Sequence, residues 1–252
     1  MRDFTYYTYK NLLNSIIKSG YSIQTMEDFI IKPKEKVVVL RHDCDLWPNN
    51  DLKMALIEFK LGIRATYYFR MPYTFNIKII KRIKELNHEI GYHYENLAEF
   101  KGDYSKSIED FKVNLKKLRS IYPVKTIVMH GRPLSKWDGK LLWKKYNYKN
   151  YGIIAEPYLS VNYDEVLYLT DTGNMWNGHK VSIRDTVNSK MNYDINSTFD
   201  LIQFFEKNKL PNQIIINSHA DRWNDNYIVW LYKDILQKLK NFIKRGLKII
   251  RN

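Results

Sequence analysis

The chain has few of the features that mark a secreted, membrane-spanning or multidomain protein. It contains one cysteine in 252 residues, which excludes an intrachain disulfide framework and a cysteine-rich zinc site. It has no apolar run of about 18 residues, so we expect no membrane span. Residues 1–20 lack the apolar stretch of a secretory signal, and we therefore expect a cytoplasmic protein. No repeat and no linker rich in Pro, Gly or Ser interrupts the chain, which favours one continuous domain.

Acidic residues are scarce relative to basic ones. Lys and Arg number 41 and Asp and Glu number 27, which gives a formal net charge of +14. This balance is typical of nucleic-acid binders or of proteins with acidic substrates. The basic residues are spread along predicted helices with apolar residues between them, as on solvated helix faces, and no nucleic-acid-binding motif occurs. We therefore expect no specific nucleic-acid partner, and nothing in the sequence indicates an oligomeric state.

Helix-like and strand-like patterns alternate along the chain. The periodicity of apolar residues predicts helices near residues 12–17, 50–62, 77–86, 108–118, 199–207 and 228–245. Strand candidates lie at residues 36–40, 63–69, 89–93, 126–130, 152–155, 166–170, 181–183 and 213–217. Such an alternation predicts an α/β protein with a mostly parallel sheet or barrel.

Polar clusters follow the ends of several predicted strands. The residues concerned are Asp43, Asp45, His93, His130, Asp171 and His219. Each has an ordinary structural explanation when taken alone, as a helix cap, a buried histidine or a turn former. In parallel α/β folds, however, active sites are built from the loops that follow the strands. Taken together on one face, these residues indicate an active site.

The residue types in these clusters suit metal-assisted hydrolysis. Asp43 and Asp45 stand two residues apart at a strand end, so both carboxylates can point to one site, one binding metal and the other acting as base. Carboxylate oxygen combined with imidazole nitrogen suits zinc or another divalent transition metal ion. Cys44 between the aspartates is expected to point into the barrel wall as a small apolar residue, with a soft metal ligand or nucleophile as the alternative.

The clusters belong to motifs whose order and spacing are informative. They are RHDCD (41–45), LGIRATYYFR (61–70), HEIGYHYE (88–95), MHGRP (129–133), YLTDTGNMW (168–176) and NSHADRW (217–223). In this order the chain resembles the polysaccharide deacetylases with a NodB homology domain, carbohydrate esterase family four, in the bacterial branch with an Arg-His-Asp-x-Asp motif. The similarity extends from about Val37 to Trp223.

The resemblance implies a fold and an activity. The fold is a distorted (β/α) barrel of about seven parallel strands in a single domain, residues 1–252, with residues 1–35 as an N-terminal helical extension packed on the barrel. The activity is removal of acetyl groups from sugars with one divalent metal ion, usually zinc. It also implies catalytic roles for Asp43 as base, His219 as acid, Asp171 as the carboxylate that orients the acid, and Arg132 or His130 as the group that tunes the base.

The metal site departs from the family pattern. Asp45 matches the metal-binding aspartate and His93 the first histidine of a His-x-x-x-His motif, but the second position holds Leu97, which cannot bind metal. Glu95 is the favoured replacement because it shares a face with His93 if the strand continues. The alternatives are His130 and His42.

The substrate is the least determined part of the prediction. Trp176 and Trp223 are expected to stack on a sugar ring, and His42 to contact the substrate. The motifs predict a metal-dependent carbohydrate deacetylase that cleaves an amide C–N bond, other than a peptide bond, in an acylated amino sugar or glycan precursor of surface polysaccharide synthesis. A nucleotide- or lipid-linked sugar is favoured over an assembled cell wall, because no secretory signal is seen.

Two other functions remain open from the sequence. Leu97 favours a metal-free descendant of the same fold that only binds carbohydrate. An Asp-x-Asp after a strand is also found in glycosyltransferases, where it binds a metal ion and a nucleotide diphosphate. That second alternative does not explain the histidines that follow the other strands.

Overall fold

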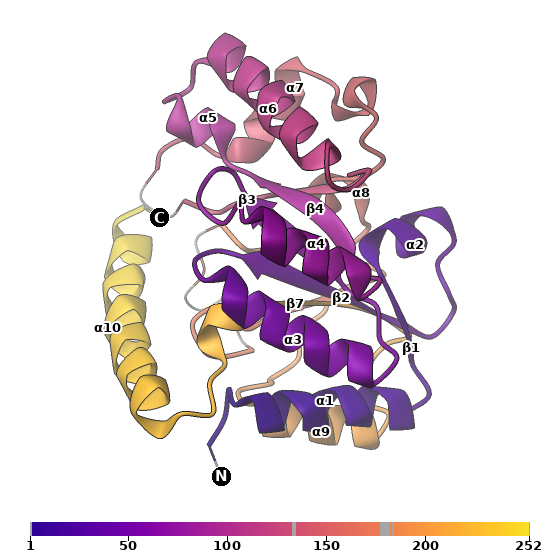
Figure 1. Ribbon diagram of the computed structural model, residues 1–252. Coiled ribbons are helices and arrows are strands. Elements are labelled where there is room, and N and C mark those ends of the chain that lie inside the picture. The colour runs from indigo at the N-terminus through magenta and orange to yellow at the C-terminus, as the bar shows by residue number, and fades with distance from the viewer. Residues whose placement is uncertain (1, 133–134, 177–181, 183, 252) are drawn as a thin grey trace.

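Parallel strands form one curled sheet in a computed structural model that describes residues 2–132, 135–176, 182 and 184–251 (Figure 1). The seven-stranded sheet has the order β5-β4-β3-β2-β7-β6, with β1 also paired to β2. The strands are β1 (Ser22–Gln24), β2 (Val37–Cys44), β3 (Thr66–Arg70), β4 (Glu89–Tyr94), β5 (Ile127–Met129), β6 (Leu167–Thr170) and β7 (Gln213–Ser218). In the described ranges no strand pairing joins β5 to β6, so the predicted distorted (β/α) barrel is a curled sheet with an open side.

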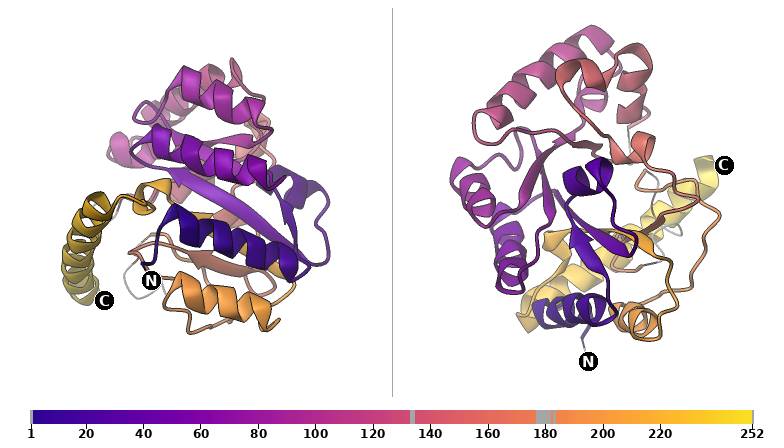
Figure 2. Two further views of the ribbon diagram at one scale, coloured as in Figure 1. Left: turned by 60° about the horizontal axis from the view of Figure 1, so that its bottom comes forward. Right: turned by 90° about the vertical axis from the view of Figure 1, so that its right-hand side faces the viewer.

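Helices surround the curl (Figure 2). They are α1 (Tyr6–Lys18), α2 (Met26–Ile31), α3 (Pro48–Lys60), α4 (Ile77–Glu85), α5 (Asn96–Glu99), α6 (Tyr104–Arg119), α7 (Leu142–Lys145), α8 (Pro157–Ser160), α9 (Thr198–Glu206) and α10 (Tyr227–Arg251), with short 3-10 turns η1 (Gly139–Leu141), η2 (Tyr148–Tyr151) and η4 (Ala220–Arg222). Helices α1 and α9 run side by side along one edge of the molecule (Figure 1). Of the helices described, none has both the length and the apolar character needed to cross a bilayer.

The predicted helices and most predicted strands are confirmed. The 152–155 strand is wrong, because this segment makes only an isolated bridge between Ala155 and Thr126. For the 181–183 strand, Val181 and Ile183 lie outside the described residues. Strand β1 was not predicted, since three residues are too few to show a period of two. Through β1, the expected N-terminal helical extension contributes one strand to the sheet, beside the first half of β2.

Strand β2 directs alternate side chains to opposite sides of the sheet. The side chains of Val37 and Val39 pack with those of Met26 and Ile215, inside the curl. Those of Val38, Leu40 and Cys44 join the larger core beneath the helices. Because the period of a strand is two, Arg41 and Asp43 continue the inner face, and His42 continues the outer one. Cys44 is fully buried in the outer layer, as predicted for a small apolar residue.

The buried carboxylate of Glu156, the residue just before α8, is hydrogen-bonded to residues at the ends of both β4 and β5. Glu156 is fully buried, and its Oε1 accepts hydrogen bonds from the Met129 backbone N–H (3.0 Å) and from the Tyr94 hydroxyl (3.2 Å). Its Oε2 has no partner among the residues that the structure describes. Burial raises the pKa of Glu156 to about 7, although the Met129 N–H and the Arg41 charge oppose the shift.

This carboxyl group should make stability depend on pH. Between the ordinary carboxyl pKa and about pH 7, the folded chain holds a proton on Glu156 that the unfolded chain has released, so its contribution to the free energy of unfolding falls as pH rises. In Glu156→Gln this dependence should disappear, with a difference of up to about 3 kcal/mol between about pH 5 and pH 8. Denaturant unfolding of both proteins at each pH measures it. The exposed Glu165→Gln is the control, and equal pH dependence in all three proteins would contradict the prediction.

Candidate metal and catalytic site

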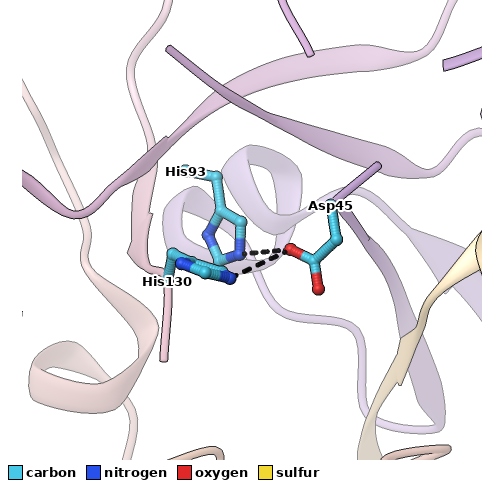
Figure 3. Close-up of side chains that lie close together, drawn as sticks. All are labelled: Asp45, His93 and His130. Carbon is cyan, nitrogen blue, oxygen red and sulfur yellow. Dashed lines mark ion pairs between the residues drawn. The ribbon is translucent and has the colours of Figure 1, made fainter. Parts of the chain in front are cut away.

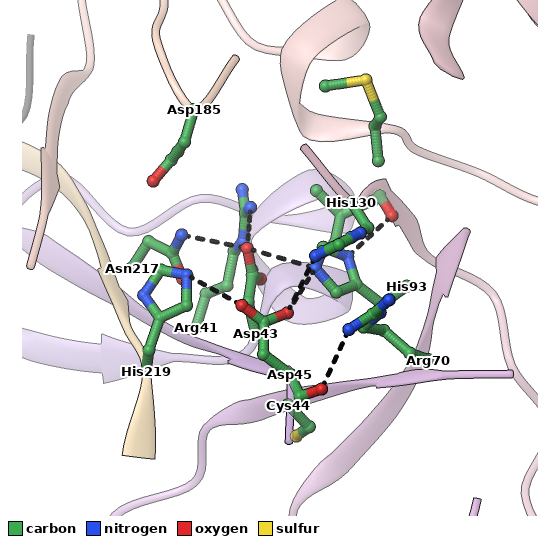
Figure 4. Close-up of polar contacts among 12 residues, drawn as sticks. Arg41, Asp43, Cys44, Asp45, Arg70, His93, His130, Asp185, Asn217 and His219 are labelled. Atoms are coloured by element: carbon green, nitrogen blue, oxygen red, sulfur yellow. Dashed lines mark hydrogen bonds and ion pairs between the residues drawn. The ribbon is translucent and has the colours of Figure 1, made fainter. Parts of the chain in front are cut away.

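The carboxyl ends of β2, β4, β5 and β7 meet at one cleft of about 840 Å³. Its lining includes six of the candidate site residues from the sequence, namely Asp43, Asp45, His93, His130, Arg132 and His219. All but Arg132 are labelled in Figure 4. The cleft therefore lies where active sites of parallel α/β folds are found.

Asp45, His93 and His130 converge on one point at the base of this cleft (Figure 3). One potential ligand atom from each lies within 4.8 Å of the others. Asp45 Oδ1 is 3.4 Å from His93 Nε2 and 3.5 Å from His130 Nε2, and it is buried without a hydrogen-bond partner within the described residues. A buried carboxylate oxygen that faces two imidazole nitrogens in this way fits a divalent cation with mixed oxygen and nitrogen ligands.

The opposite nitrogen of each imidazole is held by a hydrogen-bond acceptor. His93 Nδ1 is 3.1 Å from the Val128 carbonyl oxygen, and His130 Nδ1 is 2.9 Å from Glu95 Oε2. Burial alone would raise the pKa of Glu95, but His130 and Arg70 lower it to about 2, so this acceptor is ionised. Since a carbonyl and a carboxylate only accept, both Nδ1 atoms carry a proton, and Nε2 is the nitrogen that each ring turns toward Asp45.

Glu95 supports a ligand and does not occupy the third ligand position expected for it. Its Oε1 accepts two hydrogen bonds from Arg70, at 2.9 and 2.7 Å, and its Oε2 is bonded to Arg132 Nε at 2.7 Å as well as to His130. With both oxygens occupied, the carboxylate orients the His130 ring instead of facing His93. Leu97 is fully buried in α5 and faces the core.

The pairing of β4 with β5 explains why His130 is the third member of the group. His93 pairs with Val128, and the His130 backbone N–H continues the ladder to the Tyr94 carbonyl at 2.8 Å. His130 is therefore two residues beyond the partner of His93 and projects from the same face of the neighbouring strand. This relation depends on strand register and could not be seen in either motif alone.

The group that holds the candidate base is Arg41, and not Arg132 or His130 as the motifs suggested. Arg41 is fully buried and binds Asp43 in a bidentate manner, with Nε–Oδ1 at 2.8 Å and Nη2–Oδ2 at 2.7 Å. Asn217 Nδ2 donates a further hydrogen bond to Oδ2 at 3.0 Å. Burial would raise the pKa of Asp43, but Arg41 and His93 outweigh it and hold the pKa well below the ordinary carboxyl range.

His219 and Asp171 form the pair that the motifs predicted. His219 Nδ1 is 2.7 Å from Asp171 Oδ1, and the His219 backbone N–H donates to Oδ2 at 2.9 Å. Arg222 and the Trp223 indole also donate to the same carboxylate, each at 2.9 Å. Burial and Arg222 lower the pKa of His219, but Asp171 outweighs both and the pKa is raised overall. The ring is thereby fixed with Nε2 turned toward Asp45 Oδ2, at 3.9 Å.

The three residues expected to contact substrate do not reach the cleft. Trp176 and Trp223 are 3% and 0% exposed, and their indole nitrogens donate to Thr198 and Asp171 within the core. His42 is completely buried on the outer face of β2, where its Nε2 is 2.7 Å from Glu58 Oε1. These expectations are wrong because closeness to a motif in sequence does not determine the side of the sheet to which a residue points. The aromatic side chains that line the cleft are Trp137 and Tyr158.

Three further residues at the site were not identified from the sequence. They are Arg41, Asn217 and Asp185. Side chains two residues apart in a strand share a face, and this pattern links Arg41 to Asp43 just as it links Asp43 to Asp45. Arg41 could therefore have been predicted at the site from the sequence. Asp185 lines the cleft across from Asn217 and His219 (Figure 4) and accepts hydrogen bonds from the hydroxyls of Tyr158 (2.7 Å) and Thr172 (2.6 Å). It lies in an irregular segment without periodicity, and only the fold brings it to the site.

Comparison with known proteins gives structural likenesses at low identity. The chain is similar in fold to carbohydrate esterases of family 4. A CE4 esterase from Streptococcus mutans is 14% identical, with a TM-score of 0.49 over 86% of this chain and 85% of that one. The catalytic domain of a peptidoglycan N-acetylglucosamine deacetylase from Eubacterium rectale is 12% identical, with a TM-score of 0.46 over 83% and 87%. A CE4 pseudoenzyme from Bacillus anthracis is 14% identical, with a TM-score of 0.45 over 82% and 62%.

No family model matches the chain, and no curated protein matches its sequence. Its chemistry therefore has to be derived from its own side chains.

Zinc binding tests the three-residue group directly. We expect the protein to bind about one equivalent of zinc, and His93→Ala or His130→Ala to abolish binding, because each removes one of three donors. Glu95→Gln keeps the donors but loses the anionic acceptor of the His130 ring, so zinc affinity should fall about 10- to 100-fold. Elemental analysis and titration against a competing chelator measure both effects.

The matched control is Glu99→Gln. Glu99 lies one helical turn beyond Glu95 and accepts a hydrogen bond from the Tyr73 hydroxyl at 2.6 Å, outside the three-residue group. Its zinc affinity should equal that of the unchanged protein. Full zinc binding by His130→Ala would show that this residue is not a ligand.

Proposed function

We propose that this chain is a metal-dependent hydrolase that removes an N-acyl group, with acetyl expected, from an acylated amino sugar or glycan precursor. The observation that carries the proposal is the buried Asp45 Oδ1, which has no hydrogen-bond partner within the described residues and faces the Nε2 atoms of His93 and His130. A role in surface polysaccharide synthesis is proposed from the sequence resemblance.

Asp45, His93 and His130 would hold the metal ion, and zinc suits their donor set. When bound, such an ion supplies Lewis-acid polarisation of an acyl carbonyl and lowers the pKa of water toward about 7. The cleft leaves this point open to a substrate, since the three residues line its wall together with Asp43 and His219. A metal site with open positions is the arrangement that hydrolases use.

Asp43 is the proposed proton acceptor. The Arg41 guanidinium keeps its carboxylate ionised, and the carboxylate lies beside the metal group, with Oδ2 at 3.7 Å from His93 Nε2. Because its pKa is held well below the ordinary carboxyl range, Asp43 is a weak base. It would take a proton only from a water molecule whose pKa is lowered, which is the chemistry that a metal ion would supply. Attack of that water on the acyl carbon, with its proton passed to Asp43, begins cleavage of the amide.

His219 is the proposed proton donor. Asp171 fixes Nδ1–H and raises the pKa of the ring, which favours the protonated form whose Nε2–H faces the metal group. This proton would pass to the amine nitrogen as the C–N bond breaks, which releases a carboxylic acid and the free amino sugar. Backbone and side-chain donors on Asp171 keep the pair in this orientation.

The rim of the cleft is basic and suits a substrate with an anionic group. Lys101 and Lys136 line it, are exposed, and make no ion pair within the part of the chain that the structure describes. Arg184 also lines it, and its buried Nε has no hydrogen-bond partner among the described residues. A phosphate of a nucleotide- or lipid-linked sugar would complement these cations. Trp137 beside them offers an aromatic face to the sugar ring.

Replacing the base should separate turnover from metal binding. Asp43→Asn cannot accept a proton but leaves Asp45, His93 and His130 in place, so zinc content should stay near that of the unchanged protein. Turnover of an N-acetylated amino sugar should fall about 10²- to 10⁴-fold. Acetate release per bound zinc measures this, with thermal unfolding to confirm that the variant is folded despite the altered Arg41 contact.

Asp103→Asn is a suitable control, because Asp103 is not among the residues that line the cleft and it caps α6, where asparagine also caps. It should retain turnover. If Asp43→Asn with full zinc hydrolysed the sugar at the unchanged rate, Asp43 would not be the base. If neither protein bound zinc, the metal-free carbohydrate-binding function would be favoured.

The acid can be tested with leaving groups of different basicity. An amine must be protonated to depart, whereas p-nitrophenolate leaves without a proton. His219→Gln should therefore lose about 10²- to 10⁴-fold in turnover of the N-acetylated sugar but less than about tenfold with p-nitrophenyl acetate. Asp43→Asn should lose activity toward both compounds, since water attack is common to them. Equal losses of His219→Gln on the two compounds would exclude His219 as the acid.

A further inference from the structure

Helix α10 packs on the rest of the molecule through its polar side. The Trp230 indole donates to the Asp3 carbonyl at 2.7 Å, Lys233 Nζ to the Asp221 carbonyl at 2.6 Å, and Asn241 Nδ2 to the Gly173 carbonyl at 2.8 Å. These three residues lie on one side of the helix at about 100° per residue. The helix runs along one flank of the molecule (Figure 1; Figure 2, left).

The opposite side of α10 is apolar and exposed. Its members are Ile228 (77% exposed), Leu231 (36%), Tyr232 (63%), Ile235 (58%), Leu239 (58%), Phe242 (77%) and Ile243 (54%). At about 100° per residue they cover an arc of roughly 120°. An ordinary surface helix turns such an arc toward the core, whereas α10 turns it away. A contiguous apolar face of this kind marks a surface that meets another apolar medium.

The charge of α10 identifies that medium. Residues 227–251 contain seven basic residues, namely Lys233, Lys238, Lys240, Lys244, Arg245, Lys248 and Arg251, against one acidic residue, Asp234, which gives the segment a net charge of +6. A second copy of the chain would bring the same positive charge to the same contact. An anionic lipid surface complements it, and lysine-rich helices with one apolar face are typical of peripheral membrane binding.

The same helix forms a wall of a second cleft that reaches the catalytic residues. This cleft of about 660 Å³ is lined by Tyr232, Lys233 and Lys240 of α10 and also by Asp45 and His219. Exposed Trp47 lies in it, with Lys233 Nζ at 4.9 Å from the ring centre. A sugar carried on a lipid would therefore find a path from the surface of α10 to the site.

We propose that α10 docks on an anionic membrane surface with its apolar arc between the lipid headgroups, and that the substrate is an acylated amino sugar carried on a lipid of that membrane. The docking stands on the helix alone, and the substrate class rests on the proposed hydrolase function. Both parts use the same orientation, because the helix that meets the lipid also borders the cleft.

Vesicle binding tests the docking. The full chain should cosediment with vesicles of phosphatidylcholine and phosphatidylglycerol, and more weakly with phosphatidylcholine alone or at high salt. The triple variant Ile235→Ser, Leu239→Ser, Phe242→Ser should bind at least about tenfold more weakly, because three apolar side chains no longer insert. The control replaces exposed Ile31 and Val113, 66% and 63% exposed on α2 and α6, with serine and should bind as the unchanged protein does.

Two outcomes would overturn the docking. One is equal binding of the triple variant and the unchanged protein to anionic vesicles, or no binding by either. The other is a dimer that forms in solution, dissociates on the triple substitution and competes with vesicles, since a second copy would then cover the arc. Light scattering during size-exclusion chromatography detects such a dimer.

Hydrolysis separates the docking from the function. On N-acetylglucosamine anchored to vesicles by a dialkyl glycerol, the triple variant should lose turnover as it loses binding, at least about tenfold. On the same sugar free in solution it should equal the unchanged protein, because none of the three residues lines either cleft described here. Vesicle binding without hydrolysis of either sugar would overturn the hydrolase function and leave the docking. If the triple variant lost turnover equally on the anchored and the free sugar, the proposal that the substrate is carried on a lipid would be overturned.

Discussion

The buried ion pair between Arg41 and Asp43 is the interaction on which the site depends. Both side chains arise from the inner face of β2, and both are almost completely buried. An unpaired carboxylate there would take up a proton, because burial disfavours its charged form. The bidentate guanidinium prevents this, and the rings of Tyr158 and Tyr168 lie over the guanidinium at 5.1 and 5.9 Å from its central carbon. An ionised carboxylate can therefore lie within the curl of the sheet.

Arginine side chains also hold two other buried carboxylates near the cleft. Glu95 is neutralised by Arg70 and Arg132, and Asp171 by Arg222. In each case a planar guanidinium satisfies the carboxylate and leaves its pKa low despite burial. Asp45 differs, because its Oδ1 faces the imidazoles of His93 and His130, and each ring uses its Nδ1 for a hydrogen bond elsewhere. The site thus carries a carboxylate without a guanidinium partner among the described residues, at the point where two Nε2 atoms converge, and this arrangement is the physical basis for proposing a metal ion.

Much of this arrangement could be predicted from local patterns. Alternation of period-two and period-3.6 segments predicted the parallel α/β sheet, and the strand ends predicted where Asp43, His93 and His219 meet. The replacement for Leu97 could not be predicted in this way, since the choice between Glu95 and His130 depends on the register of β4 against β5. The prediction that Trp176 and Trp223 stack on a sugar ring was wrong for a related reason. Apolar rings near a motif look like a sugar platform in sequence, but the fold buries them behind it, next to Phe4.

Helix α10 is a second case in which local sequence patterns predicted an element but not its surroundings. Its periodicity predicted a helix near residues 228–245, but periodicity gives only the existence of an apolar face and not the neighbour of that face. Every hydrogen bond that ties α10 to the body comes from the polar side, from Trp230, Lys233 and Asn241 among the described residues. Among its described side chains, the apolar arc of α10 is exposed, whereas the apolar residues Ile79, Ile80 and Ile83 of α4 are buried. Polar anchoring fixes the helix with its apolar arc outward, and the free energy of burying that arc remains available to a membrane surface.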